Sequence, residues 1–172
     1  MAILKDFQAD ALRVRVSDSR EAMGRDAARA AGECIRALLG ERDEINMIFA
    51  AAPSQNETLK YLAREEGIDW HRVNAFHMDE YVGLSREAPQ SFGYYLCEHV
   101  FSLLPFKSVN FLRGDAPDAA AECARYAELL RRFPPDVVML GIGENGHIAF
   151  NEPHDSFDKG THPVTLTQST IE

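Results

Sequence analysis

The stretch from Gly143 to Glu152 combines residue types that can move protons with glycines that admit a ligand. It reads Gly-Glu-Asn-Gly-His-Ile-Ala-Phe-Asn-Glu, so His147 lies two residues after Asn145 and five before Glu152. A histidine ordinarily titrates near neutrality and can pass protons, and a carboxylate along the same turn can orient or charge-stabilise its imidazole. Gly143 and Gly146 would let the backbone approach a small substrate closely. This spacing predicts a catalytic loop, although a glycine-rich turn with a surface histidine would show the same pattern.

A second candidate is an acidic pair, Asp79 and Glu80, which directly follows a strand-like apolar run. Shielding by Phe76, Met78 and Tyr81 would disfavour the charged form of a carboxylate there and raise its pKa, which suits a general base. The alternative is structural, because an aspartate at the end of a strand often only caps a turn. Both interpretations place the pair at the carboxyl end of a strand.

A third candidate is the Pro-Ser-Gln-Asn stretch of residues 53–56, which precedes a predicted helix. Free backbone N–H groups and the helix dipole at such a start attract anions, so Ser54 and Gln55 are candidate ligands of a phosphate. An N-capping role for Ser54 explains the same residues equally well.

The glycines of residues 141–146 also match the dinucleotide fingerprint G-x-G-x-x-G. That fingerprint opens a long helix and is followed about 20 residues later by an acid that binds the ribose. Pro153 would end any helix here after little more than a turn, and residues 160–162 are Gly-Thr-His. A metal centre would draw on His147, Glu152, His154 and Asp155. No compact ligand motif such as H-E-x-x-H occurs, so we expect neither a metal nor an organic cofactor.

Strand-like and helix-like patterns alternate along the chain and must position these three stretches. Strands are predicted at residues 11–16, 45–52, 73–78, 109–112 and 136–141, with a further strand-like start at 164–167. Helices are predicted between Asp18 and Gly40, through Leu59 and Leu62 to Gly67, from about Phe92 to Leu104, and from Ala119 to Arg132. Ser91 and Asp118 are the predicted N-caps of the last two helices. This alternation predicts an α/β fold with a mostly parallel, doubly wound (Rossmann-like) sheet and helices on both faces. Ligands of such folds bind beyond the carboxyl ends of the strands, where the three stretches converge.

Packing predictions follow from the same patterns. The first helix, capped by Asp18, is predicted to bury a stripe formed by Met23, Ala27, Ala30, Cys34 and Leu38. The cysteines are odd in number and scattered, so we expect reduced, buried thiols at Cys34, Cys97 and Cys123. Tyr94 and Tyr95 are interpreted as packing residues.

Composition narrows the class of protein further. The chain has 172 residues with 18 Lys+Arg against 27 Asp+Glu, a net charge of −9, and no basic block. This balance argues against general binding to nucleic acid or to an anionic membrane. No apolar run reaches the roughly 18–20 residues of a membrane span, and residues 1–16 lack the apolar core of a secretory signal. We therefore expect one cytoplasmic domain over residues 1–172, monomeric or homo-oligomeric, with a small molecule as its partner.

Two of the three stretches resemble the signature segments of the glucosamine/galactosamine-6-phosphate isomerase family, which includes deaminases and 6-phosphogluconolactonases. The segments are Val73–Leu84 and Leu140–Pro153, and the resemblance runs in order from about residue 12 to the end. Lactonases usually have Asp-Glu-Arg and Gly-His-Thr, whereas this chain has Asp-Glu-Tyr at 79–81 and Gly-His-Ile at 146–148. The deaminase form fits better, and lactone hydrolysis is the alternative.

The resemblance implies a reaction that converts glucosamine 6-phosphate and water to fructose 6-phosphate and ammonium, without a metal or organic cofactor. By resemblance, His147 assisted by Glu152 and Asn145 would open the sugar ring. Asp79 would then abstract a proton next to the carbon–nitrogen centre and return it to the neighbouring carbon. The Ser54–Gln55 loop corresponds to the phosphate-binding loop of the family.

The chain departs from the family pattern in three places. Asn145 stands where many deaminases carry an aspartate, so it can orient His147 but supplies no charge. Glu57 follows the phosphate loop and would sit near an anion. The family continues well past Glu172, so we expect a domain that is incomplete at its C-terminal end. An inactive sugar-phosphate-binding fragment is therefore the main alternative to an enzyme. A sensor on the same fold is less favoured, because such sensors normally carry a DNA-binding helix-turn-helix and this sequence shows no basic face.

Overall fold

The computed structural model describes residues 3–153 and 158–171, and the structural statements below concern these residues. Its strands are β1 (Ile3–Ala9), β2 (Leu12–Ser17), β3 (Ile45–Phe49), β4 (Val73–His77), β5 (Ser108–Asn110) and β6 (Val137–Met139). Its α-helices are α1 (Arg20–Glu41), α2 (Asn56–Leu62), α3 (Phe92–Leu96), α4 (Ala119–Arg132) and α5 (Gln168–Ile171). Short helical turns lie at Pro53–Gln55 and Trp70–Arg72, and a π-helical turn at Cys97–Phe101 extends α3.

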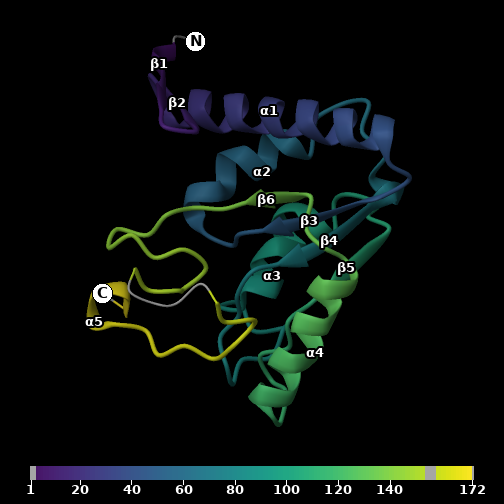
Figure 1. Ribbon diagram of the computed structural model, residues 1–172, viewed down its shortest axis with the longest axis vertical. Coiled ribbons are helices and arrows are strands. Elements are labelled where there is room, and N and C mark those ends of the chain that lie inside the picture. The colour runs from purple at the N-terminus through teal and green to yellow at the C-terminus, as the bar shows by residue number, and fades with distance from the viewer. Residues whose placement is uncertain (1–2, 154–157, 172) are drawn as a thin grey trace.

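Four strands form one parallel sheet in the order β5-β4-β3-β6 (Figure 1). Phe49 of β3 is in register with both His77 of β4 and Met139 of β6. Because the strands are parallel, the segments that follow these three residues leave the sheet at one edge. The predicted α/β fold with a mostly parallel sheet is confirmed, and the three stretches that could carry chemistry all start at that edge.

Helices pack on both faces of this sheet. On one face, Met47 and Phe49 of β3 are fully buried in a core with residues of α1, α2 and α3. On the other face, Tyr126 of α4 and the adjoining Phe133 lie against Phe76 of β4, with ring centroids 6.2 and 6.3 Å apart. The doubly wound arrangement that the sequence predicts is therefore present.

Helix α1 starts and packs differently from the prediction. Its N-cap is Ser19 rather than Asp18, because the Ser19 hydroxyl accepts a hydrogen bond from the Ala22 N–H. The predicted stripe mostly faces solvent, and Met23 is 43% exposed. The buried positions are instead Ala22, Gly24, Ala28, Gly32, Ile35 and Leu39.

Two glycines of α1 explain the shift of its buried face. A Cβ on Gly24 would overlap Glu57 of α2, and a Cβ on Gly32 would lie 2.7 Å from Glu65 Oε2. The missing side chains let α2 and the segment that follows it approach α1 closely. A count of apolar side chains does not register glycine as a contact residue, so the prediction chose the neighbouring stripe.

The strand predicted at residues 11–16 exists as β2, but it pairs antiparallel with β1 in a hairpin outside the main sheet (Figure 1). The sequence did not predict β1, because charged and polar residues interrupt its apolar pattern. One hairpin face is tied to α1 by Arg15, whose Nη1 lies 3.0 Å from Asp26 Oδ2. The opposite face carries Phe7 and Leu12, which are 48% and 66% exposed.

The strand predicted at residues 164–167 is absent, and the helix α5 follows these residues. Cys34 is exposed and Cys97 and Cys123 are partly buried, so the thiols are free but not fully buried. Within the described ranges, no helix has the length and apolar character needed to cross a membrane.

Candidate active site

A cavity of about 170 Å³ opens at the edge of the sheet where β3, β4 and β6 end. Of the predicted site residues, Ser54, Asp79, Gly143 and His147 line it together. Gln55, Asn145, Gly146 and Glu152 are not in its wall. Residues up to 93 positions apart in the sequence thus share one small space, as the parallel topology predicts.

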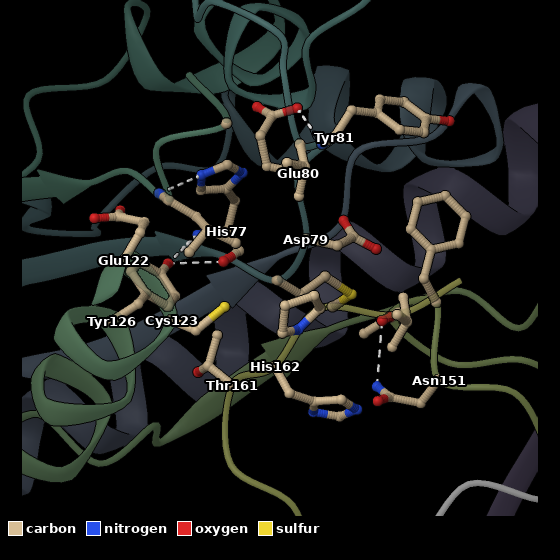
Figure 2. Close-up of a pocket in the computed structure, with 18 of the residues that line it drawn as sticks. His77, Asp79, Glu80, Tyr81, Glu122, Cys123, Tyr126, Asn151, Thr161 and His162 are labelled. Carbon is tan, nitrogen blue, oxygen red and sulfur yellow. Dashed lines mark hydrogen bonds between the residues drawn. The ribbon is translucent and has the colours of Figure 1, made fainter. Parts of the chain in front are cut away.

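Asp79 lies two residues after the end of β4 and borders this cavity. Burial, with a smaller contribution from the charge of the neighbouring Glu80, raises the pKa of Asp79 from 3.8 to about 7. Figure 2 shows its carboxylate turned away from His77 and Tyr126, toward the side of the pocket that Asn151 borders. A carboxylate with this pKa can both take up and release a proton near neutral pH.

Glu80 points away from the cavity and caps α3. Its carboxylate accepts hydrogen bonds from the Ser91 hydroxyl at 2.7 Å and from the N–H groups of Phe92 and Gly93 at 3.1 and 2.9 Å. Ser91 caps the same helix by accepting from the Tyr94 N–H, as the sequence predicts. The chain between β4 and α3 is therefore held at both ends, which fixes the position of the residue preceding Glu80.

The orientation of the Asn145 amide identifies the protonated nitrogen of His147. Asn145 Nδ2 donates to Glu152 Oε2 at 2.7 Å, so Oδ1 faces the other way and accepts the main-chain N–H of His147 at 3.1 Å. The same Oδ1 lies 2.8 Å from His147 Nδ1. Because a carbonyl oxygen only accepts, Nδ1 carries a proton, and the Nε2 lone pair is left for a substrate. The ring lies against Gly143, where any Cβ would overlap it.

Within the described residues, Glu152 does not make the direct contact with His147 that the sequence suggested. It is linked to the imidazole through the Asn145 side chain. Its Oε1 accepts hydrogen bonds from the Thr167 N–H at 3.2 Å, the Thr167 hydroxyl at 3.0 Å and the Thr170 hydroxyl at 2.8 Å. These bonds, the Thr167 N–H first, lower the pKa of Glu152 and keep it ionised. No sequence pattern links positions 15 to 18 residues apart in irregular chain, so these threonines were missed.

Ser54 and Gln55 end a helical turn, Pro53–Gln55, that runs directly into α2. No side chain caps either helical start, so the capping alternative for Ser54 is wrong. A Cβ on Gly141 would lie 3.5 Å from Gln55 Nε2 and 3.7 Å from Ser54 Oγ. The two polar side chains therefore reach the backbone that follows β6, and Gln55 is only 9% exposed.

Glu57 does not direct its charge at this loop. Its Oε2 lies 2.8 Å from Nη2 of Arg20 at the start of α1, and this pair lowers the pKa of Glu57. The same Arg20 nitrogen donates to the Pro53 carbonyl at 2.9 Å. The Arg20 charge therefore offsets that of Glu57, so Glu57 repels an anion near Ser54 less than its sequence position suggests.

An aromatic cluster of Phe150, Phe92 and Tyr81 adjoins His147 through its Phe150 ring. The Phe150 ring lies 5.5 Å from His147, 5.6 Å from Phe92 and 5.9 Å from Tyr81, measured between ring centroids. Phe150 and Phe92 also line the cavity. The Phe150 ring therefore packs beside the imidazole, and Phe92 and Tyr81 pack on Phe150 in turn.

A strained turn aims Phe150 at the cavity. Ala149 and Phe150 have φ angles of +52° and +56°, which non-glycine residues rarely adopt. The turn is closed by hydrogen bonds between Ile148 and Asn151, whose Nδ2 also donates to the Ile148 carbonyl at 2.9 Å. The letters Ala-Phe carry no sign of a left-handed backbone, so the sequence could not predict this turn.

A larger cavity of about 570 Å³ lies on the α4 side of the sheet (Figure 2). It shares Met78, Asp79, Ala149 and Phe150 with the smaller one. His77 borders it but is 1% exposed, and burial lowers the pKa of His77 to about 4. Its Nε2 accepts the Leu112 N–H at 2.8 Å, so His77 is a neutral structural residue.

Glu122 of α4 is a second buried ionisable residue beside this larger cavity. Its carboxylate accepts hydrogen bonds from the side chains of Arg125 and Arg113, and also from the Arg113 N–H at 2.8 Å. These partners, Arg125 first, lower the pKa of Glu122 to about 2. The network ties α4 to the segment after β5 and is fully engaged, so it supports the cavity wall.

The alternative uses of residues 141–155 find no support in the described residues. The chain after β6 forms turns, including one that Gly146 enters with a φ of +90°, rather than the helix of a dinucleotide site. Two of the four suggested metal ligands, His154 and Asp155, lie outside the described residues. Across the residues that are described, no three His, Cys, Asp or Glu side chains group into a metal site.

The fold and site together define a doubly wound α/β protein with an acid–base cavity at the carboxyl edge of its sheet. Residues 18–169 match the family described as glucosamine-6-phosphate isomerases/6-phosphogluconolactonase. The chain belongs to this family.

Curated relatives support the same assignment. A glucosamine-6-phosphate deaminase of Listeria monocytogenes serotype 4a (strain HCC23) is 47% identical over 129 residues, or 75% of this chain and 55% of the relative. One from Exiguobacterium sp. (strain ATCC BAA-1283 / AT1b) is 40% identical over 147 residues, or 86% and 58%. This chain therefore spans somewhat more than half the length of these relatives.

Solved structures agree with the fold. A monomeric glucosamine-6-phosphate deaminase superposes with a TM-score of 0.80 and 32% identity, covering 90% of this chain and 65% of that one. A 6-phosphogluconolactonase from Shewanella baltica superposes with a TM-score of 0.67 at 22% identity, covering 77% and 57%, and shares the fold.

Proposed function

We propose that this chain acts on an amino-sugar phosphate and converts glucosamine 6-phosphate and water to fructose 6-phosphate and ammonium. The observation that carries the proposal is the shared 170 Å³ cavity, in which Asp79, His147 and Ser54 face one small space. Relatives named glucosamine-6-phosphate deaminase, at 40 to 47% identity, support the same reaction. Each step needs only acid–base groups that this chain supplies.

His147 opens the sugar ring in this proposal. Its Nε2 takes the proton of the C1 hydroxyl and a proton is delivered to the ring oxygen, which breaks the bond between C1 and that oxygen. The imidazolium formed in between is held by the Asn145 oxygen on Nδ1. The ionised Glu152 behind Asn145 polarises the amide and stabilises this charge.

Asp79 then transfers a proton along the open chain. Its carboxylate removes the proton from C2, which bears the amine, and returns it to C1. The enol-type intermediate between these steps becomes an imine-bearing carbon that water converts to the ketone, with release of ammonium. A base whose pKa is about 7 is half ionised at neutral pH and close to the optimum for such a transfer. Activity should therefore fall as the pH drops below about 7.

The phosphate provides binding energy away from the reacting carbons. Ser54 lines the cavity, and Gln55 lies behind it next to the chain that leads to Gly143. Gly143 and Gly146 keep that chain close to the cavity, since one meets the His147 ring and the other permits the turn. Anchoring the phosphate holds C1 and C2 in register with Asp79 and His147.

The same proposal covers the setting of the reaction. The partner is a small sugar phosphate rather than nucleic acid or a membrane, and the compartment is the cytoplasm. A monomer is the favoured state, because the superposed deaminase is described as monomeric. The chain is a single domain whose counterpart in the relatives is longer.

The test is ammonium release from glucosamine 6-phosphate at pH 7.5, with fructose 6-phosphate measured in parallel. We expect equal amounts of both products from the wild type, and none from Asp79→Asn, which should still bind the substrate. Exposed Asp115→Asn is the matched control and should keep full activity. Hydrolysis of 6-phosphogluconolactone in place of ammonium release would contradict the proposal and favour the lactonase alternative.

A further inference from the structure

We propose that Tyr95 is a positioning residue that holds the phosphate loop, residues 52–56, in its binding shape. The inference rests on the proposed function, because that function assigns phosphate binding to this loop, whose Ser54 lines the cavity. The Tyr95 hydroxyl donates to the Ala52 carbonyl at 2.7 Å and lies 2.5 Å from Asn56 Oδ1. One side chain of α3 therefore spans the loop and contacts both of its ends.

The loop has few other means of holding its shape. Residues 50–53 are Ala-Ala-Ala-Pro, so they offer no polar side chain, and no side chain caps the helical turn. Inside the loop, the Asn56 N–H donates to the Pro53 carbonyl, and the Gln55 N–H donates to the Ala52 carbonyl at 2.8 Å. The Ala52 carbonyl therefore accepts two hydrogen bonds, one from inside the loop and one from Tyr95.

Arg20 holds the next peptide from the opposite side. Its Nη2 donates to the Pro53 carbonyl at 2.9 Å. In a planar trans peptide the carbonyl and the following N–H point in opposite directions, so the Pro53 carbonyl sets the direction of the Ser54 N–H. Tyr95 adds an outside contact to the peptide plane before Pro53, and Arg20 adds one to the plane after it. Together they determine how Ser54 is presented to the cavity.

Tyr95 is itself held in one rotamer. The His99 ring stacks on the Tyr95 ring with centroids 4.0 Å apart and planes 19° apart. His99 Nδ1 lies 2.7 Å from the Tyr95 carbonyl, one turn earlier, which fixes the imidazole over the phenol. Burial raises the pKa of Tyr95 to about 12, so its hydroxyl stays a donor throughout the neutral range. A side chain that changed rotamers freely could not hold a loop, whereas the stacked His99 ring restricts Tyr95.

The first test needs no enzymatic activity. Amide exchange of Ser54, Gln55 and Asn56 is compared by NMR in the wild type, Tyr95→Phe, and the control Tyr94→Phe, whose tyrosine is exposed on the same helix. We expect about five- to tenfold faster exchange at these amides in Tyr95→Phe and no change in Tyr94→Phe, because only the former loses a hydrogen bond to the loop. His99→Gln should give a smaller increase. Unchanged exchange in Tyr95→Phe would overturn the proposal.

The second test separates binding from chemistry. With glucosamine 6-phosphate, Tyr95→Phe should raise KM about five- to tenfold and leave kcat within twofold of the wild type, since the loop contacts the phosphate and not the reacting carbons. A fall in kcat at constant KM, or no change in either constant, would contradict the positioning role. If the wild type itself releases no ammonium, the proposed function fails, and the amide exchange alone decides whether Tyr95 holds the loop.

Discussion

Asp79 and His147 face the same cavity, but the protein prepares them in different ways. Asp79 follows a fully buried strand, and apolar surroundings raise its pKa. His147 lies in a segment without regular structure, where a chain of hydrogen bonds through Asn145 to Glu152 sets its tautomer. Burial tunes the one residue and directed polar contacts tune the other. The two sides of the cavity should therefore respond differently to substitution.

The largest effect is expected on the hydrogen-bonded side. His147→Gln removes the group that opens the ring, so we expect kcat to fall about 10³-fold. The melting temperature should change little, because His147 is only partly buried and lies outside the core. Steady-state kinetics and thermal unfolding measure the two quantities on the same sample. A variant with nearly full activity would remove His147 from the reaction.

On the buried side, Asp79→Asn should stabilise the fold at neutral pH while it stops turnover. The folded-state pKa of about 7 exceeds the unfolded value of 3.8, so the group's favourable contribution is complete below about pH 4 and is lost as the pH rises through 7. Replacing it with a neutral amide removes this loss, with a ceiling of about 4 kcal/mol at pH 8. Urea unfolding at pH 5 and pH 8 tests this, and the gain should be larger at pH 8. An equal gain at both values would contradict burial as the cause.

A smaller effect is expected where the polar chain ends. Glu152→Gln keeps the shape but removes the charge behind Asn145, so kcat should fall about tenfold with KM unchanged. Thr167→Val should lower kcat less, because it weakens only part of the contact with Glu152. Exposed Glu144→Gln, in the same segment, is the matched control. Equal losses in Glu144→Gln and Glu152→Gln would mean that net charge, and not the contact, matters.

The smallest expected effect concerns the turn beside His147. Ala149→Gly relieves a φ of +52° that alanine adopts only under strain, so the free energy of unfolding should rise by about 1 kcal/mol after the extra flexibility of glycine is subtracted. Activity should fall about twofold to fivefold, because Phe150 is then aimed less firmly at His147. Chemical unfolding and kinetics check both changes. A loss of stability would show that the turn is not strained.

The sequence predicted the buried side of the cavity better than the polar side. The apolar run at residues 73–78 is a local sequence pattern that predicts a buried strand. β4 and Asp79 lie where this pattern placed them. The contacts of Glu152 with Thr167 and Thr170 depend on how the chain before and within α5 folds back on the loop, and no local pattern encodes this. The same limit hid the left-handed turn at Ala149.

The sequence also failed where close packing relies on a missing side chain. The stripe through Met23 and Cys34 was chosen because it is apolar, yet α1 packs against α2 at Gly24 and against the segment after α2 at Gly32. Caps were predicted more reliably, since Ser91 and Asp118 both accept hydrogen bonds from the helices they precede. Ser19 in place of Asp18 is an error of one residue in such a cap.

Gly24 is far along the chain from the reacting groups, yet the fold should be sensitive to its substitution. A single methyl group there would overlap Glu57 and push α2 away from α1. Because α2 continues directly from the turn that carries Ser54, the displacement would reach the cavity as a misplaced hydroxyl. A library of random substitutions screened for activity should therefore record Gly24 among its intolerant positions, although a screen guided by proximity to the substrate would never select it.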